Sequence, residues 1–98
     1  MAWKVNWSQE ASNDLDRIAE YIKRDSEVYA KSVVRRILES TRKLQQFPRM
    51  GRIVPELGDE NLRELLVISY RVIYRIEDNE VTIAAIAHTK QSLGIDSL

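Results

Sequence analysis

The sequence contains no cysteine, only three glycines and two prolines, and a single histidine, His88. The lack of cysteine excludes disulfides, thiolate metal sites and cysteine nucleophiles, and it fits a reducing compartment. One histidine without clustered carboxylates cannot build a catalytic zinc site, and so few scattered glycines cannot form a phosphate-binding loop. No apolar run approaches the roughly 20 residues of a membrane-spanning helix, and the N-terminus lacks a secretory segment. We therefore expect a cytoplasmic protein that uses neither a metal nor a nucleotide cofactor.

Charge is balanced over the whole chain but segregated along it. The 98 residues carry 15 basic and 15 acidic side chains, which argues against a protein that binds nucleic acid through bulk charge alone. Residues 31–52 nevertheless contain seven basic residues and one acidic residue, whereas residues 53–80 contain seven acidic and three basic residues. This pattern is typical either of solvated surfaces or of a surface that binds a partner.

Residue patterns in the N-terminal half predict a strand followed by two antiparallel helices. Apolar residues alternate with polar ones over residues 3–7, as in a strand with one apolar face. Ser8 is suited to cap a helix that extends to about Arg24 and carries apolar residues at helical spacing. After a break at residues 25–26, a second amphipathic helix is expected to end before Pro48, because proline cannot continue a helix.

The C-terminal half predicts a loop followed by a three-stranded antiparallel meander. The loop is expected at residues 48–61, which hold both prolines and two of the three glycines. Short apolar segments separated by turn-forming residues then indicate strands joined by tight turns. The three strands are expected at residues 62–68, 70–77 and 81–88.

These elements define the fold class and the domain organisation. Two helices that are separate from an antiparallel sheet are typical of the α+β class. A chain of 98 residues is long enough to form one domain with its own core, so we expect a single domain over residues 1–98. Residues 91–98 lack a clear pattern and are expected to fray.

The last hairpin is predicted to bring Arg71 close to His88. Asp78 and Asn79 both suit the positive φ angles of a two-residue turn, which sets the register of the flanking strands. Continued alternation then places Ser69 opposite His88, with Arg71 diagonal to it and within reach of a long side chain. A one-residue change in register would move His88 away from Arg71, so the juxtaposition depends on uninterrupted pairing. The core face of this hairpin would hold Val72, Tyr74 and Ile76 together with Val81, Ile83 and Ala85.

Over about residues 5 to 90, the chain resembles the ParE/RelE superfamily of small toxins from type II toxin–antitoxin modules. The resemblance depends on the order and spacing of several short motifs. It implies the fold of that family and a cognate antitoxin, with which the toxin would form a hetero-oligomer. The matching motifs are Trp7-Ser8 with Ala11 and Leu15, Leu44 with Phe47-Pro48-Arg49-Met50-Gly51-Arg52, Leu62-Arg63-Glu64-Leu65, Tyr70-Arg71-Val72-Ile73-Tyr74-Arg75, and the strand ending in His88.

The resemblance implies one of two activities. Members similar to ParE poison DNA gyrase without an obvious catalytic set, whereas RelE-like members are endoribonucleases that cut mRNA on the ribosome. The long helical hairpin and the Phe-Pro-x-x-Gly-Arg loop at residues 47–52 resemble ParE more closely, so gyrase poisoning is the favoured function. The alternatives are a ribosome-dependent mRNA endoribonuclease and a non-toxic member that only binds its antitoxin.

The nuclease alternative names two candidate catalytic residues. By its place in the strand motif, Arg71 matches an arginine that contacts phosphate in RelE-like nucleases. His88 lies where some nuclease relatives carry a histidine, a residue type that suits proton transfer near neutral pH. The basic segment that follows in RelE is reduced here, because Gln91 stands where RelE has an arginine. A protein–protein mechanism is therefore favoured.

Basic residues of the second helix and the following loop are the candidate partner-binding residues. Successive residues on a helix differ in direction by about 100°, so part of this charge only keeps the helices soluble. The rest would attract an acidic segment of the antitoxin, which the resemblance implies folds on binding, or the acidic or DNA-bearing surface of a topoisomerase complex. The candidates are Arg35, Arg42, Arg49 and Arg52.

Overall fold

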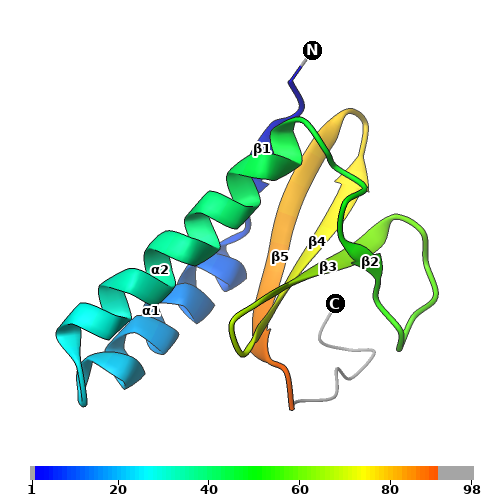
Figure 1. The fold of residues 1–98 in the computed structure, drawn as a ribbon. Helices are drawn as coiled ribbons and strands as arrows, with labels where there is room; N and C mark the ends of the chain where they lie inside the picture. The colour runs from blue at the N-terminus through cyan, green and yellow to red at the C-terminus, as the bar shows by residue number, and fades with distance from the viewer. Residues whose placement is uncertain (1, 91–98) are drawn as a thin grey trace.

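A two-helix hairpin packs against one face of a five-stranded sheet (Figure 1). The computed structural model describes residues 2–90 of the chain. The predicted order of a strand, two helices and a group of strands is confirmed, and with it the α+β class. Residues 91–98, for which fraying was predicted, lie outside the described residues. In chain order, the elements are β1 (Lys4–Trp7), α1 (Gln9–Lys23), α2 (Glu27–Arg42), the 3-10 turn η1 (Lys43–Gln45), β2 (Arg52–Ile53), β3 (Leu62–Val67), β4 (Tyr70–Glu77) and β5 (Glu80–His88).

Both long helices begin at serine caps. The Ser8 hydroxyl accepts a hydrogen bond from the N–H of Ala11 at 3.0 Å, and the Ser26 hydroxyl accepts one from the N–H of Tyr29 at 3.1 Å. α2 continues into η1, and the helical segment ends before Pro48, as predicted. None of the helices within residues 2–90 combines the length and the apolar character needed to cross a bilayer.

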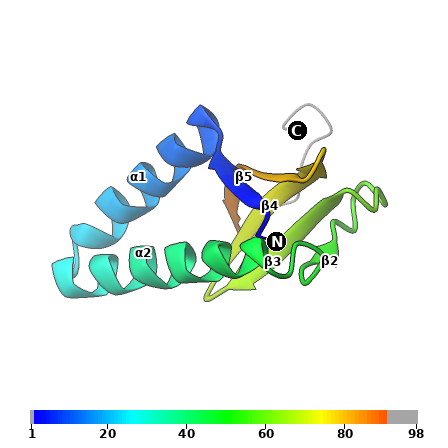
Figure 2. The ribbon, with the colours of Figure 1, turned by 90° about the horizontal axis from the view of Figure 1, so that it is seen from above.

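The sheet has two strands more than the predicted meander. Its order is β1-β5-β4-β3-β2, with β1 parallel to β5 and all other pairs antiparallel. The predicted loop at residues 48–61 contains β2, which pairs with β3 along the sheet edge. Alternation indicates strands but not their partners, and two residues are too few to show alternation at all. Seen from above, the two helices meet at the tip of their hairpin and diverge toward the sheet (Figure 2).

Apolar side chains fill both faces of the sheet, but unequally. The main core lies between the helices and the sheet, and Ile37 of α2 and Tyr74 of β4 are fully buried in it. A smaller cluster on the opposite face joins Val54, Ile73 and Ala85. The segment between β2 and β3 therefore covers part of the face that the helices leave uncovered, which we call the open face.

The hairpin between β4 and β5 has the predicted turn but not the predicted register throughout. Asp78 and Asn79 have φ angles of 48° and 61°, and Glu77 pairs with Glu80 as expected. The register shifts between Ile73 and Tyr74, because Ala84 of β5 is an extra residue in the ladder. Every β5 side chain beyond this bulge therefore lies on the face opposite to the one predicted.

Two polar side chains from the start of α1 hold the bulge. The Ser8 hydroxyl donates to the carbonyl of Ala84 at 3.1 Å, and the N–H of Ile86 donates to the Asp14 carboxylate at 2.9 Å. Because β1 pairs with β5 only as far as Ile83, these contacts replace strand pairing along the rest of that edge. Ala85 joins the open face and Ile86 joins the main core, which corrects the predicted core position of Ala85.

Candidate functional site

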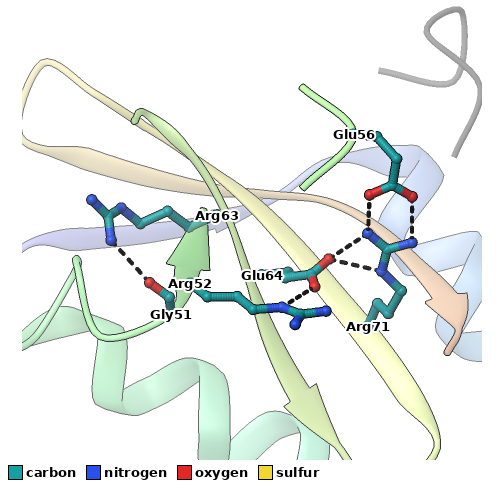
Figure 3. Close-up of polar contacts among 6 residues, drawn as sticks. All are labelled: Gly51, Arg52, Glu56, Arg63, Glu64 and Arg71. Atoms are coloured by element: carbon teal, nitrogen blue, oxygen red, sulfur yellow. Dashed lines mark hydrogen bonds and ion pairs between the residues drawn. The ribbon is translucent and has the colours of Figure 1, made fainter. Parts of the chain in front are cut away.

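Four charged side chains converge on the open face of the sheet (Figure 3). They are Arg71 of β4, Glu64 of β3, Arg52 of β2 and Glu56 of the following loop, and we call them the charge cluster. Strand pairing sets Arg52 directly opposite Glu64, and it sets Arg71 diagonal to Glu64, because Glu64 lies opposite Ile73. The sheet register therefore builds most of this cluster.

Arg71 lies at the centre of the charge cluster. Its Nε and Nη2 atoms each lie 2.7 Å from Oε1 of Glu64, and its Nη1 and Nη2 atoms contact the two Glu56 oxygens at 2.8 and 2.6 Å. Arg52 Nε donates to the other Glu64 oxygen at 2.6 Å. The side chains of Glu64 and Arg71 are 0% and 6% exposed. Two buried charges are thus neutralised by each other and by two more exposed partners.

The electrostatics of the cluster stabilise the charged form of Arg71. Hydrogen bonds to Glu56, and to a smaller extent to Glu64, raise the pKa of the Arg71 guanidinium above its usual value, although burial acts in the opposite direction. The bidentate contact with Glu56 has the geometry in which arginine also binds phosphate. A phosphate that approached Arg71 here would therefore have to displace the Glu56 carboxylate.

His88 does not join Arg71, contrary to the prediction. The bulge at Ala84 sets Tyr70, not Ser69, opposite His88, and Arg71 lies opposite Ala87. Arg71 therefore points to the open face, and His88 lies on the side of the helices with Tyr70. The His88 and Tyr70 rings are in an edge-to-face arrangement with centroids 5.7 Å apart. Gln91, the other residue that the nuclease alternative concerns, lies outside the described residues 2–90.

The predicted partner-binding arginines lie on two different surfaces. Arg35 and Arg42, two helical turns apart on α2, line an open groove of about 390 Å³ between α1 and α2. Apolar residues such as Val34 and Leu38 also line this groove. Arg52 instead belongs to the charge cluster, and Arg49 lies in the loop that leads to β2. The structure therefore does not join all four into one basic surface.

The loop at residues 47–52 is held by Arg63 and Tyr74. Arg63 donates from Nε to the carbonyl of Glu60 at 2.9 Å, and from Nη1 to the carbonyls of Arg49 at 3.2 Å and Gly51 at 3.0 Å. The buried Tyr74 hydroxyl accepts the N–H of Gly51 at 2.9 Å. A Cβ atom on Gly51 would lie 2.7 Å from this hydroxyl, so the close approach requires glycine. We call residues 47–52 the clamped loop.

Three residues of these sites were not predicted from the sequence. Glu64 had a recognisable signal, because a carboxylate within the apolar strand Leu62–Val67 needs a partner, and the turn near Ser69 places Arg71 within its reach. Glu56 and Arg63 had none, because their contacts depend on the path of an irregular loop. Within residues 2–90, no group of three His, Cys, Asp or Glu side chains is arranged to hold a metal ion.

Chains from three solved structures of toxin–antitoxin proteins have a similar fold. One chain of the chromosomal ParDE toxin–antitoxin system from P. aeruginosa superposes with a TM-score of 0.73 at 24% identity, over 89% of this chain and 96% of that chain. A chain of the RelBE2 toxin–antitoxin complex from Mycobacterium tuberculosis gives 0.64 at 22% identity, over 90% and 99%. A mutant of the E. coli toxin RelE in the free state gives 0.64 at 15% identity, over 92% and 86%. At these identities the likeness shows the fold.

The sequence settles the family. Residues 5–93 match the family described as the ParE toxin of the type II toxin–antitoxin system, parDE. The chain belongs to this family and is thus a type II toxin of the ParE/RelE superfamily, which confirms the predicted resemblance. No curated protein has a sequence significantly similar to it.

Proposed function

We propose that this toxin stops growth by poisoning DNA gyrase through protein–protein contacts, and that a cognate antitoxin neutralises it. The family match over residues 5–93 supports a ParE-type activity. The observation that carries the proposal is the state of Arg71, whose guanidinium is held between Glu64 and Glu56. The candidate proton-transfer residue, His88, lies on the other face of the sheet. A nuclease would need both groups at one phosphate.

The antitoxin would bind along the groove between α1 and α2. A segment that folds on binding needs a long apolar surface, and Val34 and Leu38 supply one. Arg35 and Arg42, which line this groove, would pair with acidic residues of the segment. The toxin and antitoxin would then form a hetero-oligomer. Charge reversal of Arg35 and Arg42 together should weaken antitoxin binding, and an unchanged affinity would exclude this surface.

Purified toxin tests the proposed target directly. It should inhibit DNA supercoiling by gyrase or trap gyrase on cleaved DNA, and saturating antitoxin should reverse the effect. A parallel experiment should induce the toxin without antitoxin in cells and follow DNA breaks and mRNA integrity separately. Unaffected gyrase together with mRNA cuts in translating ribosomes would contradict the proposal and favour the endoribonuclease. Absence of any growth effect would identify a member that only binds its antitoxin.

A further inference from the structure

Two apolar side chains are exposed at the ends of one tight turn in the clamped loop. Phe47 is 61% exposed and Met50 is 49% exposed. The N–H of Met50 donates to the carbonyl of Phe47 at 3.1 Å, which closes a β-turn with Pro48 at its second position. The ends of such a turn lie within about 7 Å of each other. Phe47 and Met50 therefore extend from neighbouring positions of the backbone, and we treat them as one apolar patch.

The backbone beneath this patch is unusually well anchored for a surface loop. Arg63 donates hydrogen bonds to two carbonyls of the loop, and the Tyr74 hydroxyl accepts the N–H of Gly51. Arg52, the last residue of the loop, forms an ion pair with the buried Glu64. Surface loops are ordinarily the more mobile parts of a protein. A loop that is already ordered loses little conformational entropy when a partner binds it. The anchoring thus preorganises the patch for a contact outside the chain.

The chain segment that carries the patch contains charge of one sign. Residues 40–55 contain Arg42, Lys43, Arg49 and Arg52, and no acidic residue. Aromatic side chains, methionine and arginine are the residue types enriched in protein–protein interfaces. The loop also lies between the end of the helical segment and the edge strand β2, where no further strand within residues 2–90 covers it (Figure 1).

We propose that the clamped loop docks into a preformed apolar pocket, rimmed by carboxylates, on the protein that the toxin inhibits. Phe47 and Met50 would enter the pocket, and Arg49 would pair with the rim. A rigid, exposed turn fits a pocket in a folded protein, whereas an antitoxin segment that folds on binding fits the long groove between α1 and α2. That this pocket lies on gyrase rests on the function proposed above.

The test compares two double variants, each of which replaces two exposed apolar or aromatic side chains by alanine. Phe47→Ala with Met50→Ala removes the patch, and Val28→Ala with Tyr29→Ala removes exposed apolar side chains at the tip of the helical hairpin, where they are 81% and 50% exposed. The loop variant should raise the toxin dose for half-maximal growth arrest and for half-maximal gyrase inhibition by roughly tenfold or more. The tip variant should stay near the wild type. Both should keep the wild-type urea midpoint and antitoxin affinity.

Substitutions of Arg49 test whether carboxylates surround the proposed pocket. Arg49→Glu should weaken growth arrest by a similar factor, Arg49→Lys should retain most of it, and Arg24→Glu serves as an exposed control. An unchanged dose for the loop variant would overturn the proposal, and so would a parallel loss of antitoxin affinity, which would assign the loop to the antitoxin. If the wild type arrests growth but leaves gyrase active, the proposed target fails while the growth assay still decides the role of the loop.

Discussion

Replacing Arg71 by methionine should strongly destabilise the fold without touching the proposed docking surface. The change leaves the buried Glu64 carboxylate with Arg52 alone among the partners in the charge cluster, and Glu56 loses its bidentate contact. Removing one partner of a buried ion pair costs about 3–5 kcal/mol, because the remaining charge stays desolvated. We therefore expect a loss of this size in the free energy of unfolding at neutral pH, a large share of the roughly 5–15 kcal/mol of a typical domain.

Urea denaturation followed by circular dichroism measures this loss. The midpoint should fall by roughly 2 M for a protein of this size. Lys4→Met is the control, because Lys4 is paired with Glu80 on the surface, where their side chains are 71% and 47% exposed, so the loss should stay below about 1 kcal/mol. A second variant, Arg71→Met with Glu64→Leu, should recover much of the stability, because both buried charges are then replaced by apolar groups.

The same variants also separate a structural role of Arg71 from a catalytic one. If the toxin acts through protein–protein contacts, the Arg71→Met, Glu64→Leu protein should arrest growth once it folds. A loss of less than about 1 kcal/mol in the single variant would refute the expectation that Glu64 depends on Arg71 for its neutralisation. Because Glu64→Leu also removes the Arg52 ion pair that anchors the clamped loop, Arg52→Met is the control for activity. A fully inactive double variant beside an active Arg52→Met protein would return Arg71 to the chemistry of the site.

Three further changes test other parts of the fold. Gly51→Ala should lower the free energy of unfolding by about 1–3 kcal/mol, because its Cβ would lie 2.6 Å from the carbonyl of Glu64; an unchanged urea midpoint would show that the loop yields. Burial raises the pKa of Tyr74 above its ordinary value near 10, so only the unfolded chain ionises it readily, and stability should fall as pH rises above about 10. Tyr74→Phe should flatten that alkaline decline between about pH 9 and 11, and an equally steep decline would place its origin elsewhere. Asp14→Ala should cost about 1–3 kcal/mol and speed hydrogen exchange at the N–H of Ile86, whereas unchanged exchange would show that Asp14 does not hold the bulge.

The elements that could be predicted are those whose signals are local. The cap at Ser8, the helical spacing and the positive-φ turn at Asp78 and Asn79 act within a few residues, and the structure confirms each of them. The parallel pairing of β1 with β5 joins residues more than 70 positions apart, so no local pattern indicates it. The two residues of β2 form a strand only because β3 lies beside them.

The candidate site was predicted less well for a related reason. Arg71 and His88 were each recognised individually, but their predicted contact required alternation to continue without interruption from the turn to the strand ends. The extra residue is Ala84, and nothing in an alanine pair predicts a bulge. Its cause is the pair of contacts from Ser8 and Asp14, which lie at the other end of the chain. Side-chain placement at a sheet therefore required the tertiary structure.

The bulge has a consequence for how such chains can diverge. If Ala84 were taken into the regular ladder, the end of β5 would rotate by one pleat and carry His88 across to the face of Arg71, without changing any residue of either motif. Loss of the contacts from Ser8 and Asp14 could thus bring a histidine and an arginine together on the open face, whereas deletion of Ala84 would keep His88 opposite Tyr70. Two toxins with identical short motifs can therefore present different surfaces, and comparisons within this family need to follow strand register as well as residue identity.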